Sequence, residues 1–224
     1  MGWYKKAQSF ESMRDMSEWI STFDGQMQQY LAGLHAMKTR NKMGGLDGYA
    51  YPTLEFFFLE HGKMFESNEF TEDEMELIGK ASMVIGDMQM KQCFYNAQTL
   101  ALFRPQFKYV EGFLISGFIP VMHGWNTLNG KVIDFTMYHA NNNKPILGII
   151  PGGWEYFGVE MQTPKIRELW STHETSMPLV DNHLTRWDML KTRYNPEGEE
   201  QNEDAQNNEG PAEQDDSRSS VESR

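Results

Sequence analysis

Residues 108–136 read KYVEGFLISGFIPVMHGWNTLNGKVIDFT and decide the fold. Three runs of apolar and aromatic residues are separated near Ser116-Gly117 and at Asn129-Gly130. Asn-Gly between two apolar runs is the strongest short-range signal for a two-residue hairpin turn. The stretch therefore predicts three strands in an antiparallel meander.

The hairpin at Asn129-Gly130 also sets the register of its two strands. Leu128 would pair with Lys131, which makes His123 and Asp134 diagonal neighbours on one face of the sheet. A carboxylate in that position can reach the imidazole. A register slip of one residue would place the two side chains on opposite faces.

Cys93 is the only cysteine of the chain and opens KQCFYNAQTLAL, which has the pattern of a helix. A free thiol is a weak nucleophile near neutral pH, so it needs a base and a third group that orients the base. His123 and Asp134 offer these two parts. The alternative is that His123 is a core histidine and Asp134 a polar residue near a turn. The helix begins either at Cys93, where its dipole favours negative charge, or near Met88.

The order of these segments resembles the transglutaminase-like branch of the papain-like cysteine enzymes. The resemblance covers about residues 86–138: a helix-opening cysteine, a strand with YVEGF, then HGW in place of H-A-W and DFT in place of D-P-T. The Cys-x-x-Asn-Ala start also resembles prokaryotic and phage proteins of unassigned function. The resemblance implies a papain-like or transglutaminase-like core, with Cys93 as nucleophile, His123 as general base and acid, and Asp134 orienting the imidazole.

The rest of the chain predicts helices before and after the sheet. Apolar spacing indicates one helix over residues 13–37, or two that break near Gly25. Further helices are expected at 52–61, from the Thr71–Glu74 capping box to about Val84, at 163–170 and at 181–194, with one more strand at 155–161. This order predicts an α+β domain with an antiparallel sheet packed against helices.

We expect a single domain over residues 1–194, with a helical part to about residue 85 and the Cys-His-Asp core at about 86–160. From Asn195 onward, ten acidic residues and two arginines stand among almost no large apolar side chains. Such a segment buries too little surface to order itself, so residues 195–224 are predicted to be a disordered acidic tail. The tail accounts for about −8 of the net charge of −12, and the acidic body argues against nucleic acid as the main ligand.

Several other side chains are candidates for parts of an active site. Gln89 and Gln92, or the backbone N–H of Cys93, are oxyanion candidates. Trp125, Trp154 and Tyr156 are substrate-groove candidates, although aromatic strand residues are more often core. The remaining histidines have no partners at metal-ligand spacing and no phosphate or dinucleotide loop is present, so we expect no metal and no cofactor.

Two function classes follow. The first is a thiol-dependent acyl-transfer enzyme, an amide or ester hydrolase or a transglutaminase-like transferase acting on a peptide, a protein or a small amide. The second is a non-catalytic acidic interaction protein, for example a phage-encoded binder of a host factor, on a degenerate papain-like scaffold. The chain has no apolar secretory run and no bilayer-spanning window, and its lone thiol fits a reducing compartment. A cytoplasmic location, in the producing cell or a host cell, is therefore expected.

Overall fold

The computed structural model describes residues 12–41, 48–85, 91–117, 119–173 and 176–195. The chain divides into two units, Met1–Tyr194 and Asn195–Arg224, and the fold is that of the first unit. The acidic tail predicted for residues 195–224 lies outside the described residues apart from Asn195.

The described part of the first unit contains helices and a single six-stranded sheet. The helices are α1 Met13–Ile20, α2 Gln26–Arg40, α3 Leu54–His61, α4 Glu72–Ile85, α5 Cys93–Phe103, α6 Thr163–His173 and α7 Asp188–Lys191, with a short 3-10 helix at Thr136–Tyr138. The strands are β1 Lys63–Phe65, β2 Lys108–Ile115, β3 Val121–Leu128, β4 Lys131–Asp134, β5 Ile146–Leu147 and β6 Glu155–Met161.

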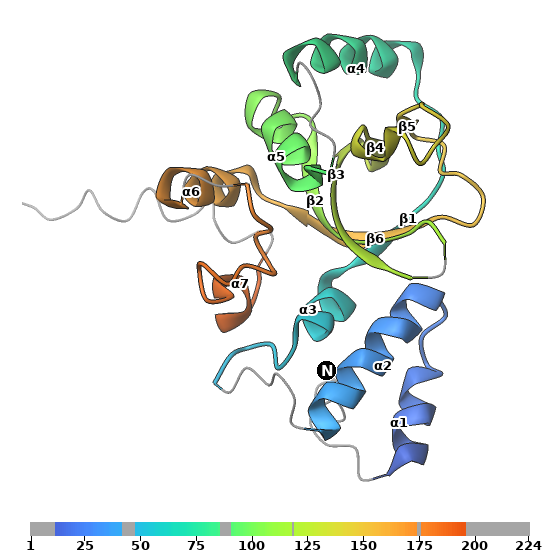
Figure 1. Ribbon diagram of the computed structural model, residues 1–224, viewed down its shortest axis with the longest axis vertical. Coiled ribbons are helices and arrows are strands. Elements are labelled where there is room, and N and C mark those ends of the chain that lie inside the picture. Colours follow the sequence, from blue (N-terminus) through green and yellow to red (C-terminus); the bar gives the residue numbers. More distant parts are fainter. Residues whose placement is uncertain (1–11, 42–47, 86–90, 118, 174–175, 196–224) are drawn as a thin grey trace, which may run out of the picture. The chain divides into compact units, whose positions relative to one another are not determined.

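The sheet has the strand order β1-β6-β2-β3-β4-β5, and each neighbouring pair is antiparallel. Figure 1 shows the strands curling, with helices packed around them. The predicted α+β class, an antiparallel sheet packed against helices, is confirmed. The predicted hairpin is also present, since Leu128 pairs with Lys131 and Asn129 and Gly130 both have positive φ.

Alternation along β2 separates two apolar cores on the two faces of the sheet. Tyr109 and Phe113 belong to a core with side chains from α2, α3 and α6, whereas Val110 and Leu114 belong to a second core. The second core lies on the face that we call the inner face, and its buried members are Phe65, Val110, Leu114, Trp125, Val132, Ile146 and Tyr156. Side chains that alternate with period two explain the separation.

The predictions for the first helices agree with the structure. Residues 13–40 form two helices, and the break falls at Gly25, which is the extended residue before α2. The capping box before α4 is formed by two reciprocal hydrogen bonds: the Glu74 N–H donates to Thr71 Oγ1 at 3.3 Å, and the Thr71 N–H donates to Glu74 Oε2 at 2.8 Å.

The predicted helix over residues 181–194 is wrong, because only Asp188–Lys191 is helical there. Asn182 Oδ1 accepts the backbone N–H groups of Leu184 at 3.0 Å and Thr185 at 3.4 Å. Arg186 and Trp187 then take left-handed φ values of 54° and 53°. A short polar side chain that binds the nearby backbone competes with helix formation. At Asn182 the side-chain bonds form a turn, and the helix does not form there. The short strands β1 and β5 were not predicted either.

Candidate active site

Cys93 is the first residue of α5 and its thiol is free and half-buried. The preceding Gln92 is the N-cap and has no side-chain capping bond, so the N–H groups of the first turn point toward this end of the helix. Of the two starting points considered for this helix, the structure has the one at Cys93. Negative charge is favoured at such a position.

Helix α5 lies close against β3, and two residues of the strand make this possible. A Cβ on Gly124 would be 2.9 Å from Phe94 Cδ1 and 3.4 Å from Phe94 Cα, so only glycine allows this approach. Asn126 Nδ2 donates to the carbonyl oxygen of Ala97 at 2.8 Å. These contacts fix the first turn of α5, which carries Cys93, beside the strand that carries His123.

His123 and Asp134 form a buried pair on the inner face of the sheet. His123 Nε2 lies 2.6 Å from Asp134 Oδ2, and the two side chains are 5% and 1% exposed. The sequence prediction that the hairpin register would bring the carboxylate to the imidazole is confirmed. The ring of His123 also stacks on Trp125, with centroids 6.1 Å apart and an interplanar angle of 17°.

From the described residues, the Asp134 carboxylate accepts four hydrogen bonds. Oδ1 takes the backbone N–H groups of Thr136 at 2.8 Å and Met137 at 3.1 Å. Oδ2 takes His123 and the hydroxyl of Tyr156, which donates at 2.8 Å. Helix α5 is tied to the same turn, because Asn96 Nδ2 donates to Thr136 Oγ1 at 3.0 Å. The carboxylate therefore has one fixed orientation.

The electrostatics of the pair favour an imidazolium beside a carboxylate. Burial lowers the pKa of His123, but the charge of Asp134, the hydrogen bond to Asp134 and the nearby Cys93 thiol outweigh burial and raise that pKa to about 10. Burial raises the pKa of Asp134, yet the His123 charge and the hydrogen bonds from His123 and Tyr156 bring it below its ordinary value. His123 is thus protonated at neutral pH.

The Cys93 thiol lies near enough to the His123 ring to help raise the pKa of the imidazole, and this completes the arrangement. Because Nε2 faces Asp134, Nδ1 is the ring nitrogen left for the thiol. The structure thus brings together the three side chains that the sequence singled out, in the order thiol, imidazole, carboxylate. Such a constellation can activate a thiol and hand a proton to a leaving group.

The structure places the oxyanion and substrate-groove candidates in different surroundings. Gln89 lies outside the described residues, and Gln92 is exposed at the helix start. Trp125 and Tyr156, expected to line a substrate groove, are 1% and 0% exposed, so they belong to the core of the inner face. Alternation on β3 and β6 turns both rings inward, away from solvent. Trp154 is half-buried and packs against that core.

Sequence reasoning missed the contacts that hold the pair. Tyr156 was assigned to a groove, and Asn96 and Gly124 were given no role in positioning. The glycine of HGW carried a usable signal, because a glycine inside a strand often marks a close approach of another backbone. Nothing in the sequence shows that β6 lies beside β2, so the Tyr156 contact had no signal.

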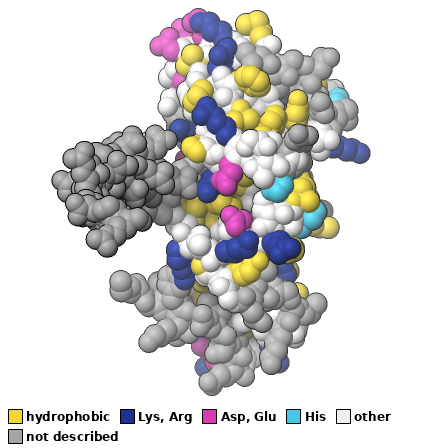
Figure 2. Space-filling view, turned by 90° about the vertical axis from the view of Figure 1, so that its left-hand side faces the viewer, with side chains coloured by type: hydrophobic (Ala, Val, Ile, Leu, Met, Phe, Trp, Pro, Cys, Tyr) yellow, Lys and Arg dark blue, Asp and Glu magenta, His cyan; other side chains and the backbone are white. Residues whose placement is uncertain are grey.

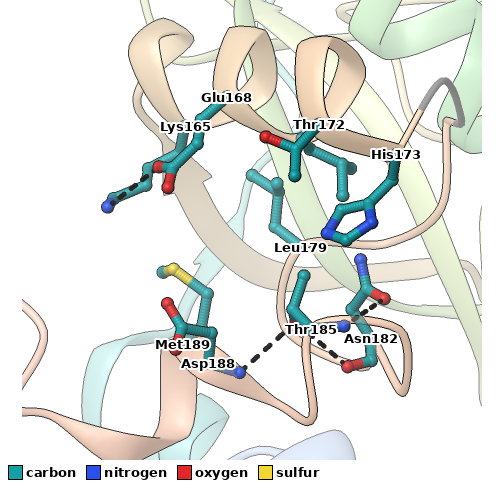
Figure 3. A pocket seen from close by; sticks show the side chains of 10 residues that line it. Lys165, Glu168, Thr172, His173, Leu179, Asn182, Thr185, Asp188 and Met189 are labelled. Carbon is teal, nitrogen blue, oxygen red and sulfur yellow. Dashed lines mark hydrogen bonds and ion pairs between the residues drawn. The ribbon is translucent and has the colours of Figure 1, made fainter.

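A hollow lies between α6 and α7, away from the three candidate catalytic side chains, none of which lines it. Its volume is about 80 Å³, and Lys165 and Glu168 of α6 face Asp188 and Met189 across it (Figure 3).

Within the described ranges no three His, Cys, Asp or Glu side chains gather as metal ligands. No described helix has the length and apolarity that crossing a membrane requires.

The described side chains on the face in Figure 2 mix basic, acidic and apolar types, and we see no continuous basic area among them there.

No protein-family model, no curated protein and no solved structure matches the chain. The geometry of Cys93, His123 and Asp134 is therefore the basis for assigning a function.

Proposed function

We propose that this protein is a thiol-dependent acyl-transfer enzyme, an amide or ester hydrolase or a transglutaminase-like transferase, that uses Cys93, His123 and Asp134. The observation that carries the proposal is the His123 ring, which is hydrogen-bonded to the buried Asp134 carboxylate and lies near a thiol at a helix start. The chain order of α5, β2, β3 and β4 supports a papain-like, transglutaminase-like core.

The proposed reaction begins with a thiolate at Cys93 and an imidazolium at His123. The sulfur attacks the carbonyl carbon of an amide or ester, and the tetrahedral intermediate collapses with loss of the amine or alcohol, which takes the His123 proton. A thioester remains on Cys93. Neutral His123 then accepts a proton from water or from a primary amine as it attacks the thioester, and the sulfur leaves as thiolate.

Asp134 supports both halves of this cycle. Its charge stabilises the imidazolium, and its hydrogen bond to Nε2 leaves Nδ1 as the ring nitrogen available to Cys93. The N–H groups at the start of α5 and the exposed Gln92 side chain are candidates to stabilise the oxyanion. The substrate class is a peptide, a protein or a small amide, and a reducing compartment such as the cytoplasm would keep the thiol free.

The test is the reactivity of Cys93 in the full chain. Because Cys93 is the only cysteine, alkylation by iodoacetamide reports on this thiol alone. We expect the wild type to react at pH 6.5 at least about tenfold faster than His123→Ala, since the variant lacks the imidazolium. p-Nitrophenyl acetate should acetylate Cys93, detected by peptide mass mapping, and Cys93→Ala should release no p-nitrophenol above background.

The matched control is His183→Ala, which removes an exposed histidine from a turn outside the site. It should alkylate like the wild type. Equal alkylation rates in the wild type and His123→Ala, together with no acetyl group on Cys93, would overturn the enzyme proposal and favour the non-catalytic binding protein.

A further inference from the structure

We infer that Tyr156 is a positioning residue, whose hydroxyl holds the Asp134 carboxylate so that the His123 ring presents Nδ1 to Cys93. This inference rests on the proposed function, because it assigns a role within the same site. It gives β6, which lies two strands away from β3 in the sheet, a part in the chemistry.

The first step of the argument is the position of the hydroxyl. Tyr156 pairs with Leu114 of β2 and with Phe65 of β1, so it reaches Asp134 across the inner face and not along a neighbouring strand. Its ring packs edge-on against Trp125, with centroids 5.1 Å apart. Trp125 in turn stacks on His123. The phenol is therefore part of one packed stack with the imidazole.

The second step concerns the acceptor that the hydroxyl contacts. Tyr156 and His123 donate to the same oxygen, Oδ2, at 2.8 Å and 2.6 Å. An ionised carboxylate oxygen has two good acceptor directions, and the two donors take both. With Oδ1 bound by two backbone N–H groups, the carboxylate cannot rotate without breaking a hydrogen bond. The fixed carboxylate in turn holds Nε2 of His123 in one direction, toward Oδ2.

The third step is the state of the groups around His123. These are Cys93 on α5, Asp134 on β4 and Tyr156 on β6. Burial, together with the charge of Asp134, raises the pKa of Tyr156 far above its ordinary value, so the phenol is always a donor. A donor that never titrates stabilises the ionised form of Asp134 across the whole working range of pH.

The test uses Tyr156→Phe, which keeps the ring and removes only the hydroxyl. Tyr51→Phe is the matched control, because Tyr51 is equally buried and its hydroxyl lies 2.6 Å from His61 Nε2, outside the site. Two measurements on the full chain are compared: the pH titration of the Asp134 carboxyl carbon by NMR, and the pH profile of Cys93 alkylation by iodoacetamide.

We expect Tyr156→Phe to move the Asp134 titration upward by about one pH unit and to change the pH profile of Cys93 alkylation. Tyr51→Phe should move neither. An Asp134 titration that is the same in the wild type and Tyr156→Phe would overturn the inference, whatever the thiol does. Equal alkylation of the wild type and His123→Ala would instead count against the proposed function, so the two failures are distinguishable.

A direct measurement on the wild type covers the case in which Tyr156→Phe does not fold. The hydroxyl proton of Tyr156 should exchange slowly with water and show a nuclear Overhauser effect to the His123 ring, because both groups meet at Oδ2. A hydroxyl proton in fast exchange would contradict the assigned contact.

Discussion

Asp134 and Glu111 are two buried carboxylates in the same sheet, and their surroundings differ in one respect that decides what each can do. Both accept a tyrosine hydroxyl, at 2.8 Å from Tyr156 and at 3.0 Å from Tyr109 respectively, and both accept backbone N–H groups. Asp134 also has the His123 ring. Glu111 has three backbone N–H groups, from residues 179–181.

The presence of an opposite charge separates the two groups electrostatically. The pKa of Asp134 lies below its ordinary value, because His123 offsets the cost of burial. Burial raises the pKa of Glu111 to about 7, and the hydrogen bonds from Leu179 and Val180 only partly oppose it. A buried carboxylate next to a titratable ring and a thiol can take part in proton transfer, whereas one bound by backbone N–H groups acts as a clamp.

Both carboxylates are connected to helix α5, on different sides. Asn96 binds Thr136 in the turn that holds Asp134. Gln98 donates to the Met177 carbonyl oxygen at 2.9 Å and accepts from Trp170 Nε1 at 2.7 Å. The Glu111 clamp and Gln98 thus hold residues 177–181 against the sheet and the helix. Both attachments contact α5, the helix that begins at Cys93.

The largest expected effect is that of Asp134→Ala. This change leaves His123 buried without its counter-charge, and loss of one partner of a buried pair costs about 3–5 kcal/mol. We expect that loss in the free energy of unfolding measured with urea at pH 7. Alkylation of Cys93 should slow by about tenfold or more, because His123 then loses its proton.

A stability loss below about 1 kcal/mol with unchanged alkylation would show that the two carboxylates are equivalent clamps, and it would break the comparison. We expect Asp134→Ala to fold, because the apolar core of the inner face is unchanged. Circular dichroism of the variant provides that control.

The pair was predictable from sequence because its two members are eleven residues apart in one hairpin. Asn129-Gly130 fixes the turn, the turn fixes the register, and the register places Asp134 beside His123. Cys93 was predictable as a member of the site because it is the only cysteine and because a thiol nucleophile needs a base such as His123. The α+β order followed from helical and strand periodicities that were clear in each segment.

The Glu111 clamp and Tyr156 were not predictable, because they depend on contacts between distant segments. Glu111 meets residues 68 to 70 positions away, and Tyr156 meets Asp134 across three strand pairings. The helix predicted over residues 181–194 is wrong for one local and one long-range reason. Their helical pattern was overridden by a local turn at Asn182, and by backbone bonds from Ala50 and Tyr51 to residues 190–191.

An intermediate effect is expected from pH at Glu111. The ordinary pKa of a glutamate, 4.5, is raised here to about 7, so between these values the folded chain keeps a proton that the unfolded chain has lost. This contribution is fully present below pH 4.5 and decreases as pH rises to 7, by roughly 2–3 kcal/mol in total. Urea unfolding at pH 5 and pH 7 measures it.

Glu111→Gln is the matched variant for this pH effect, since its amide does not titrate. The difference in unfolding free energy between the wild type and Glu111→Gln should therefore change with pH over this range. We also expect the variant to alkylate at the wild-type rate. A pH-independent difference would mean that Glu111 stays ionised and would make it resemble Asp134.

The smallest effect, of about 1–2 kcal/mol, is expected from Gly124→Ala. The added Cβ would lie 2.9 Å from Phe94 Cδ1 and 3.2 Å from Tyr109 Cε2, so the Phe94 ring has to shift, and this disturbs the first turn of α5, which carries Cys93. We expect slower alkylation of Cys93 as well as lower stability. Gly79→Ala is the control: its Cβ meets no atom within 4 Å, and it should stabilise α4 by about 0.5–1 kcal/mol without changing alkylation. If Gly124→Ala alkylates like the wild type, the close approach of helix and strand serves packing on the Tyr109 side alone and does not position the thiol.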